Sequence, residues 1–273
     1  MVITGLMYLV RGQRLLLDGD EGGTMATYGV EAIRHFGNAR ANGISTAEDL
    51  TYTFNRSNGF NSNLASAGHG QAFYWADQNC WENDIQDTDS GGDDRNWVDN
   101  VDIFWIETHG NHTSDGQARL LYDIPRDAWR AFSGSWQLGE NWNAEWVLAY
   151  SCETAALATV TGLWNIFAGL HLYCGAYDLM YDGITTDECG EDVADNLTDG
   201  DTVASAWIDG VSDWWVDNHP IVVGPGDAAT WNGGSIRWDL SAHNRDHLWG
   251  HGTVTPDLAP SQQACLLWRW AEG

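Results

Sequence analysis

The sequence contains no lysine. All 12 basic residues are arginines, against 39 acidic residues, and the formal net charge is −27 at pH 7. Nucleic acids and anionic membranes are bound through basic surfaces, so this charge argues against either as a partner. Self-repulsion of this size disfavours a compact chain unless salt screens it. We therefore expect a protein adapted to high salt, of the composition seen in haloarchaea. The alternative is a folded, acid-coated protein without that adaptation.

Long apolar runs are also missing. No stretch reaches the roughly 18 apolar residues that a membrane-spanning helix needs. Residues 1–10 are apolar, but no basic residue precedes them and no small-residue cleavage site follows, which makes a poor signal peptide. We expect no membrane insertion and a location in the cytoplasm of a salt-accumulating cell. A secreted or cell-surface location is the alternative if a leader has been removed.

Cysteines are few and scattered. The five are Cys80, Cys152, Cys174, Cys189 and Cys265, and no two form a C-x-x-C pair. An odd, dispersed set fits neither a disulfide framework nor a structural zinc site. At least one thiol is therefore free.

What the sequence does contain is enough apolar material for a core, because 17 Trp, 9 Tyr and 7 Phe are interleaved with the acids. Apolar runs typical of strands alternate with segments of helical spacing, which predicts an α/β fold with a doubly wound, mostly parallel sheet and helices on both faces. We expect one domain, with an N-terminal strand and connector (1–27), a core (28–257) and a C-terminal extension (258–273).

Individual elements follow from periodicity and turn residues. The expected strands are 51–60, 101–110, 119–122, 145–152, 170–177, 221–223, 236–240 and 264–270, and 2–17 is expected to form a strand or a hairpin. The expected helices are 28–40, 72–82, 125–132, 154–168 and 201–218.

Two of these strands end in side chains with catalytic potential. The run VDIFWIETHG (101–110) ends in His109, and EWVLAYSCET (145–154) carries Cys152 at the same relative place. Continuous apolar runs are typical of parallel strands covered on both faces, and ligands of such sheets bind beyond the carboxyl ends of the strands. We therefore expect His109 and Cys152 to meet at one edge of the sheet.

A histidine and a cysteine in this arrangement support nucleophilic catalysis. The imidazole accepts the thiol proton and the thiolate attacks. The expected helix from Thr154 would lower the thiol pKa through its dipole. The N–H groups of Gly110 and Cys152 could stabilise an oxyanion, an interaction whose loss costs about 2.7–4 kcal/mol of barrier. The alternative reading is a loop histidine and an inert buried cysteine.

The pair resembles the caspase, gingipain and legumain clan of cysteine peptidases, which carry His-Gly after one strand and Cys after the next. The resemblance implies a caspase-like fold, with His109 as base, Cys152 as nucleophile and Gly110 as oxyanion donor. His109 precedes Cys152 by 43 residues, compatible with the caspase spacing of about 50. The caspase signature Q-A-C-[RQG]-G is absent, so the chain is not a caspase proper.

A closer resemblance is to an uncharacterised, mostly prokaryotic family of the same fold. It rests on stretches between about 28 and 257, namely Ala76-Asp77 with Trp81-Glu82, Val101 to Gly110, Trp146 to Cys152 with Leu170-His171-Leu172, and HLWGHGTVTPD (247–257). Such families usually have Gly-His-Gly where this chain has Thr108-His109-Gly110. Thr108 departs from this pattern, but the two functional positions, His109 and Gly110, are kept.

The clan resemblance also implies a peptide or protein substrate. Asp178 and Asp182 follow the third buried strand, where the first pocket would lie, and an acidic pocket predicts a basic substrate side chain. Trp136 and Trp142 lie in a polar segment, so we expect both to be partly exposed at a cleft rim near His109. The rival hypothesis is a catalytically inactive interaction or envelope protein that keeps the fold.

No cofactor is required by this chemistry. Asp87, Asp89, Asp93 and Asp94 are spaced like part of a calcium loop, although the full motif is missing, and the alternative is a solvated acidic face. His109 and His112 form H-x-x-H without a third ligand nearby. His243, His247 and His251 would align for zinc on a helix, but Gly250 and Gly252 disfavour a helix there.

Overall fold

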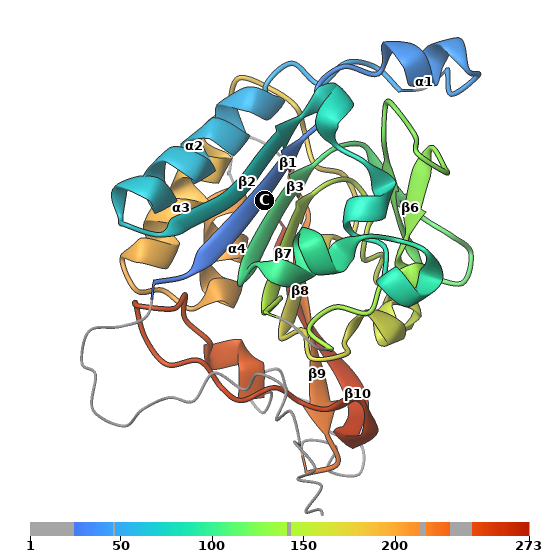
Figure 1. Ribbon diagram of the computed structural model, residues 1–273. Helices are drawn as coiled ribbons and strands as arrows, with labels where there is room; N and C mark the ends of the chain where they lie inside the picture. The colour runs from blue at the N-terminus through green and yellow to red at the C-terminus, as the bar shows by residue number, and fades with distance from the viewer. Residues whose placement is uncertain (1–24, 46, 141–142, 213–216, 230–241, 273) are drawn as a thin grey trace, which may run out of the picture.

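A computed structural model describes residues 25–45, 47–140, 143–212, 217–229 and 242–272. Its centre is a seven-stranded sheet in the order β10-β9-β8-β7-β3-β1-β2 (Figure 1). Five strands are parallel: β1 (Thr27–Ala32), β2 (Gly70–Ala76), β3 (Ile103–Glu107), β7 (Trp146–Tyr150) and β8 (Leu172–Ala176). β9 (Pro220–Asp227) is antiparallel to β8, and β10 (Gln263–Trp270) is antiparallel to β9. The expected α/β class with a mostly parallel sheet is confirmed.

Three α-helices cover one face of this sheet: α2 (Thr53–Ser66), α3 (Cys189–Thr198) and α4 (Val203–Val211) (Figure 1). Their buried side chains pack against the strands in a core that contains Phe60, Leu64, Trp105, Val193 and Trp207. The indole of Trp105 stacks on Phe60 at 4.8 Å and meets Trp207 edge to face at 6.0 Å. Aromatic side chains thus form the contact between β3 and two of the helices, α2 and α4.

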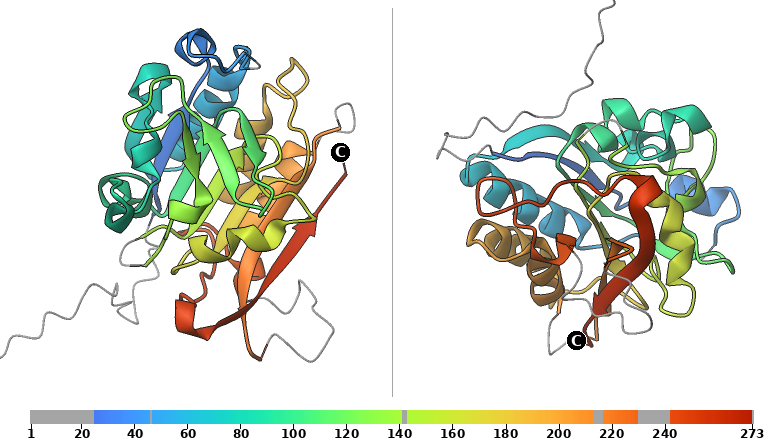
Figure 2. Two further views of the ribbon diagram at one scale, coloured as in Figure 1. Left: turned by 90° about the vertical axis from the view of Figure 1, so that its right-hand side faces the viewer. Right: turned by 90° about the horizontal axis from the view of Figure 1, so that it is seen from below.

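The opposite face is covered differently. A small antiparallel sheet of β4 (Gly110–His112), β5 (Ala118–Leu121) and β6 (Arg130–Phe132) lies there with several 3-10 segments (Figure 2). The 3-10 segments of this layer are 77–79, 82–84, 88–90, 94–96, 98–100, 133–135 and Val160–Ile166. Two more, 242–245 and 260–262, lie in the C-terminal part of the chain, and 242–245 contacts α4. The short α1 (Gly37–Ala41) follows β1. Short turns and a second sheet therefore replace the α-helical layer expected on this face.

The sequence-based assignment is wrong in the first third of the chain. The expected helix 28–40 contains β1 and α1, the expected strand 51–60 contains most of α2, and the expected helix 72–82 begins with β2. In α2 the buried positions Thr53, Arg56, Phe60 and Leu64 repeat every three or four residues. Because Arg56 counted as polar in the pattern, the helical period was hidden.

Later elements agree better. β3, β5, β7, β8, β9, β10 and α4 fall within or across the ranges expected for them. The expected helix 125–132 is instead a run of bends that leads into β6, and α3 was not expected. The expected strands 2–17 and 236–240 lie outside the described residues. None of the described helices has the length and apolarity needed to cross a bilayer.

The helix expected directly after Cys152 is absent from this described segment. Glu153 has a positive φ of 53°, a backbone conformation that disfavours helix continuation for a non-glycine residue. The N–H of Ala155 then bonds to the carbonyl of Ala176, 2.8 Å away, instead of starting a helix. A 3-10 segment begins only at Val160. Cys152 therefore gains no α-helix dipole.

Candidate active site

His109 and Cys152 lie at the same edge of the large sheet. β3 pairs in parallel with β7, with Glu107 opposite Tyr150, so the residues just beyond these two positions emerge side by side. This confirms that the two strands are adjacent and end on one edge. Both side chains line two cavities. We name these the Arg119 cavity, of about 290 Å³, and the Arg56 cavity, of about 260 Å³.

The imidazole of His109 is held by a backbone carbonyl. Its Nε2 lies 2.7 Å from the carbonyl oxygen of Glu48, and its ring packs on Phe36 with centroids 4.7 Å apart. A carbonyl only accepts hydrogen bonds, so Nε2 carries a proton. In the neutral imidazole this leaves Nδ1 as the basic nitrogen.

Cys152 is the partly exposed cysteine of the five; the other four, all within the described residues, are buried. Its Sγ lies 3.4 Å from the N–H and 3.5 Å from the carbonyl of Met180. Burial raises the pKa of the thiol, and the charges of Glu153 and Asp178 raise it further. Within the described part of the chain, no hydrogen bond joins this thiol to His109. The resting thiol is therefore neutral, not an ion-paired thiolate.

The backbone around the thiol offers hydrogen-bond donors. Hydrogen bonds join Leu121 to His109 and Thr113 to Gln117 between β4 and β5. Since bonded and non-bonded pairs alternate in an antiparallel ladder, the Gly110–Leu120 pair is non-bonded and the Gly110 N–H points away from β5. Among the described residues the Gly110 N–H has no hydrogen-bond partner, whereas the N–H of Cys152 interacts with its own thiol, which lowers the thiol pKa. The Gly110 N–H is therefore available to a substrate oxygen.

Gly110 is required sterically. A Cβ at this position would lie 2.6 Å from the carbonyl oxygen of Cys152 and 2.8 Å from side-chain atoms of Ser151 and Thr154. The hydroxyl of Ser151 also donates to the Thr108 carbonyl at 2.8 Å. The histidine and cysteine segments are thereby packed directly against each other.

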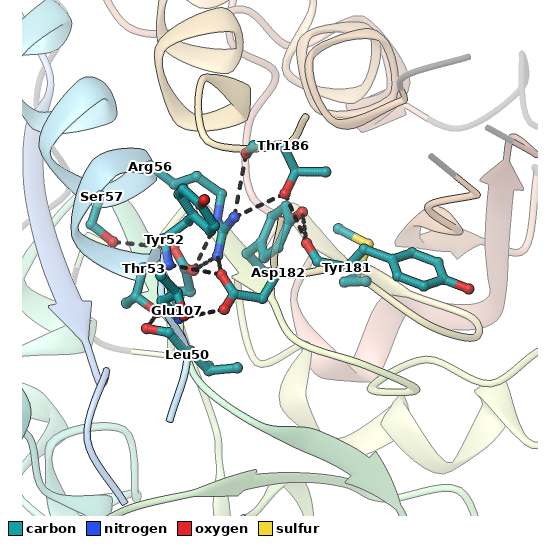
Figure 3. Close-up of polar contacts among 12 residues, drawn as sticks. Leu50, Tyr52, Thr53, Arg56, Ser57, Glu107, Tyr181, Asp182 and Thr186 are labelled. Carbon is teal, nitrogen blue, oxygen red and sulfur yellow. Dashed lines mark hydrogen bonds and ion pairs between the residues drawn. The ribbon is translucent and has the colours of Figure 1, made fainter. Parts of the chain in front are cut away.

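A buried ion-pair cluster forms the wall of the Arg56 cavity (Figure 3). The guanidinium of Arg56 pairs with Glu107 and, at 2.7 Å, with Asp182, and it donates to the hydroxyl of Thr186 at 3.0 Å. Its carbon lies 4.5 Å from the ring centroid of Tyr150. These contacts join α2, the end of β3 and the loop after β8. Burial raises the pKa of Glu107, while the charge of Arg56 opposes that shift.

The two acids expected to form the first pocket differ in position. Asp182 lines the Arg56 cavity and accepts hydrogen bonds from the backbone N–H groups of Thr51 and Tyr52. Asp178 is exposed and contributes its carbonyl to the Glu153 N–H at 2.7 Å. With one arginine facing Glu107 and Asp182, the cluster carries one excess negative charge when both acids are ionised.

The Arg119 cavity has the opposite character, since Arg119 and Arg130 both line it. Nε of Arg119 donates to the side-chain oxygen of Asn111 at 2.6 Å. Neither arginine forms an ion pair within the described parts of the chain, although the protein has 39 acidic residues. The acid lining this cavity, Glu153, instead lies 3.5 Å from His112.

Trp136 does not lie at a cleft rim. It is fully buried in the core beneath the small sheet, because the segment around it packs inward instead of forming a polar loop. The hypothesis that it contacts substrate is therefore wrong. Trp142 lies outside the described residues.

The acids of the expected calcium loop are tied into turns. Asp87 accepts from the Asp89 N–H at 2.8 Å and Gln137 at 2.7 Å, and Asp94 accepts from Thr88 at 2.9 Å. Among the described residues they do not converge as a group of three ligand atoms. Asp93 accepts from Asn96 and Trp97. Calcium at this loop stays a prediction.

The three C-terminal histidines also separate. His251 lies against His69, with Nε2 atoms 3.1 Å apart, His243 stacks on His171 at 3.9 Å, and Nδ1 of His247 lies 3.3 Å from the carbonyl oxygen of Thr253. No helix aligns them in the described segment, as Gly250 and Gly252 indicated.

Sequence reasoning missed several residues of the site. Glu48 acts through its backbone, which no side-chain pattern reveals, and Arg119 and Arg130 belong to the small sheet that covers one flank. Glu107 could have been recognised from the sequence, because a carboxylate in a buried apolar strand is stable only when it is paired with a cation. That cation, Arg56, is distant in sequence.

The fold and the site thus define an α/β protein with a cysteine–histidine pair at the carboxyl edge of a mostly parallel sheet, flanked by two cavities. The chain belongs to the DUF6345 family, a domain of unknown function, whose model matches residues 30–272. No curated protein matches the chain in sequence.

Proposed function

We propose that this protein is a cysteine peptidase or a related amide hydrolase of caspase-like architecture, with Cys152 as nucleophile and His109 as base. The observation that carries the proposal is the shared position of the two side chains. Both follow adjacent parallel strands and line the same two cavities. The tautomer of His109 supports it, because the bond to Glu48 leaves Nδ1 free to accept a proton.

The reaction would begin with base-assisted attack. The Sγ proton moves to Nδ1 of His109 while the sulfur bonds to the substrate carbonyl carbon. The resulting oxyanion accepts hydrogen bonds from the N–H groups of Gly110 and Cys152. The C–N bond then breaks and the amine leaves with the proton from His109. Water, deprotonated by His109, attacks the thioester, releases the acid and restores the thiol.

The raised pKa of the thiol favours deprotonation on substrate binding over a standing ion pair. Approach of a substrate would displace the contacts between Cys152 and Met180. The carbonyl of Glu48 serves as the third group that orients the base, a role that an Asp or Asn side chain fills in many such sites.

The two cavities support a substrate class. Glu107 and Asp182 favour a basic or polar side chain in the Arg56 cavity, held by the single excess negative charge of that cluster. Arg119 and Arg130 favour an acidic group on the other flank of Cys152. Leu179 is exposed and lines both cavities, so it offers an apolar contact between them. We infer a peptide with oppositely charged residues on the two sides of the cleaved bond.

The test combines two electrophiles with variants of the pair. A peptide acyloxymethyl ketone with a basic residue next to the warhead should label Cys152 in the wild type. Labelling should be lost in Cys152→Ala and fall by about 10²–10⁴-fold in His109→Ala. Iodoacetamide, which needs no substrate binding, should still label folded His109→Ala within a few-fold of the wild type. Ketone labelling that ignores the histidine would overturn the proposal.

Turnover is measured separately on a peptide library, with new termini identified by mass spectrometry. We propose adaptation to high salt from the net charge of −27, so these assays are run in molar KCl, where charge repulsion is screened. Cleavage should be absent from Cys152→Ala and reduced by Arg119→Gln for peptides with an acidic residue on that flank. Equal loss for neutral peptides would contradict the assigned role of Arg119.

A second candidate is a non-catalytic domain that binds peptides in the two cavities. It is favoured by the neutral thiol, whose described hydrogen bonds go to Met180 and not to His109. In that case peptides bind equally well to wild type and Cys152→Ala, and no library peptide is cleaved.

A further inference from the structure

A second group of ionisable side chains lies at the other edge of the sheet from Cys152. Glu145 directly precedes β7 and His171 directly precedes β8. His243, Asp246 and Asp257 come from the segment that runs past the amino ends of these strands (Figure 1). We call these five residues the His171 cluster. His171, His243 and Asp246 are at most 1% exposed.

Asp246 fixes which nitrogen of His171 carries a proton. Nδ1 of His171 lies 2.7 Å from Oδ2 of Asp246. The other oxygen of Asp246 accepts hydrogen bonds from the N–H and hydroxyl of Thr255, each at 2.8 Å. A carboxylate in this setting accepts hydrogen bonds, so Nδ1 of His171 is the donor. The opposite nitrogen, Nε2, then determines what the cluster binds.

Nε2 of His171 faces two further carboxylates. It lies 2.9 Å from Oε2 of Glu145 and 3.4 Å from Oδ1 of Asp257. If Nε2 carried only its lone pair, both carboxylates would repel it. A proton or a metal cation is therefore needed among these three atoms. A proton supplies one positive charge against three carboxylates of the cluster. A divalent cation supplies two and can contact all three atoms at once.

We propose that Nε2 of His171, Glu145 and Asp257 bind a divalent transition-metal ion, with zinc the best match. Tetrahedral zinc, with bonds of about 2.0–2.2 Å, separates its ligand atoms by about 3.3–3.6 Å. The three ligand atoms lie within 4.8 Å of one another, close enough for small side-chain adjustments to reach that geometry. A mixed imidazole and carboxylate set suits zinc better than calcium or magnesium, which take oxygen ligands.

The surroundings match those of metal-binding histidines. Such residues donate their other ring N–H to a carboxylate, which orients the ring, and Asp246 holds that position for His171. Asp257 is 62% exposed and Glu145 is 15% exposed, so an ion can enter from solvent and keep a water ligand. Bound there, it would join the C-terminal segment to the starts of β7 and β8 and stabilise the folded chain.

Zinc binding is measured by equilibrium dialysis and elemental analysis on the full chain in molar KCl, after treatment with a chelator. The background is Cys152→Ala, which removes the thiol that could otherwise bind zinc with His109. Millimolar magnesium competes for weak sites on the acidic surface. We expect one zinc ion per chain and a melting temperature that rises with zinc concentration.

Asp257→Asn tests the site at a solvent-exposed ligand and should weaken zinc binding at least tenfold. Asp246→Asn leaves all three ligands and should weaken it by about 10–100-fold through loss of orientation. Asp127→Asn removes the same charge from an exposed side chain in the segment before β6 and should leave binding unchanged. Absence of stoichiometric zinc, or equal binding by Asp257→Asn and the parent, would overturn the proposal. Neither result bears on hydrolysis at Cys152.

Discussion

The carbonyl oxygen of Glu48 accepts a hydrogen bond from Nε2 of His109 at 2.7 Å, and this contact sets the proton of the imidazole on the side away from its basic nitrogen. Among the described residues, no charged side chain takes part in this contact. His109 is oriented by the loop that joins α1 to α2, so its position depends on the fold of that loop.

The first prediction concerns the reactivity of Cys152 as a function of pH. Because burial, Glu153 and Asp178 raise the thiol pKa, the alkylation rate by iodoacetamide should keep rising to a higher pH than the rate of a free cysteine does. Glu153→Gln removes one of these charges and should shift the profile to lower pH. A profile that levels off at a lower pH than that of a free cysteine would contradict the neutral thiol. Asp89→Asn serves as the distant charge control.

The second prediction tests the close approach at Gly110. The Cβ of Gly110→Ala would collide with backbone and side-chain atoms around Cys152, so we expect peptide turnover to be lost and the melting temperature to fall. Gly37→Ala is the matched control, because nothing lies within 4 Å of its added Cβ. That variant should keep activity and stability, as Gly to Ala changes without strain are neutral or slightly stabilising. Full activity in Gly110→Ala would show that the two segments separate more readily than their packing indicates.

The third prediction concerns the buried pair of Arg56 and Glu107. Arg56→Met leaves the carboxylate buried without its cation and should lower the free energy of unfolding by about 3–5 kcal/mol. Adding Glu107→Leu should recover much of that loss, because both charges are then absent. Arg269→Met, at a partly exposed residue of β10, should change stability by about 0.5 kcal/mol or less. Denaturant unfolding in high salt measures all three, and additive losses in the double variant would argue against a coupled pair.

The fourth prediction concerns Asp99, whose pKa is raised to about 8 by burial and by the charges of Asp94 and Glu140. The folded state therefore keeps a proton that the unfolded state, with a carboxyl pKa near 3.9, releases. The stabilisation is complete below about pH 4 and is lost as pH rises through 8, with a slope of at most about 1.4 kcal/mol per pH unit.

Asp99→Asn keeps an acceptor for the Gly139 N–H, which lies 2.6 Å from Asp99 Oδ1, and removes the ionisation. Its stability should decline less between pH 5 and 8 than that of the wild type, measured by chemical unfolding at each pH. Burial also raises the pKa of Asp84, to about 6, so the difference between variant and wild type is the quantity that counts. Parallel curves for the two proteins would mean that Asp99 has an ordinary pKa.

The central strands and the position of His109 and Cys152 at one edge of the sheet could be predicted because that information is local. β3, β7 and β8 are continuous apolar runs buried on both faces, and a parallel sheet aligns their carboxyl ends whatever else the chain does. The absence of a helix directly after Cys152 could not be predicted in the same way. It depends on the backbone hydrogen bond from Ala155 to Ala176, which joins two segments that are separate in sequence.

The sequence by itself determined the charge, the absence of lysine, the core strands and the presence of His109 and Cys152 at the ends of two of them. Only the tertiary structure decided that the Glu48 carbonyl orients His109, that Trp136 is buried and that Arg56 lies against Glu107. It also brought His171 together with residues as distant as Asp257. The physical reason is that short-range patterns record burial and backbone preference. The partner of a buried charge or a hydrogen bond is fixed by how distant segments pack.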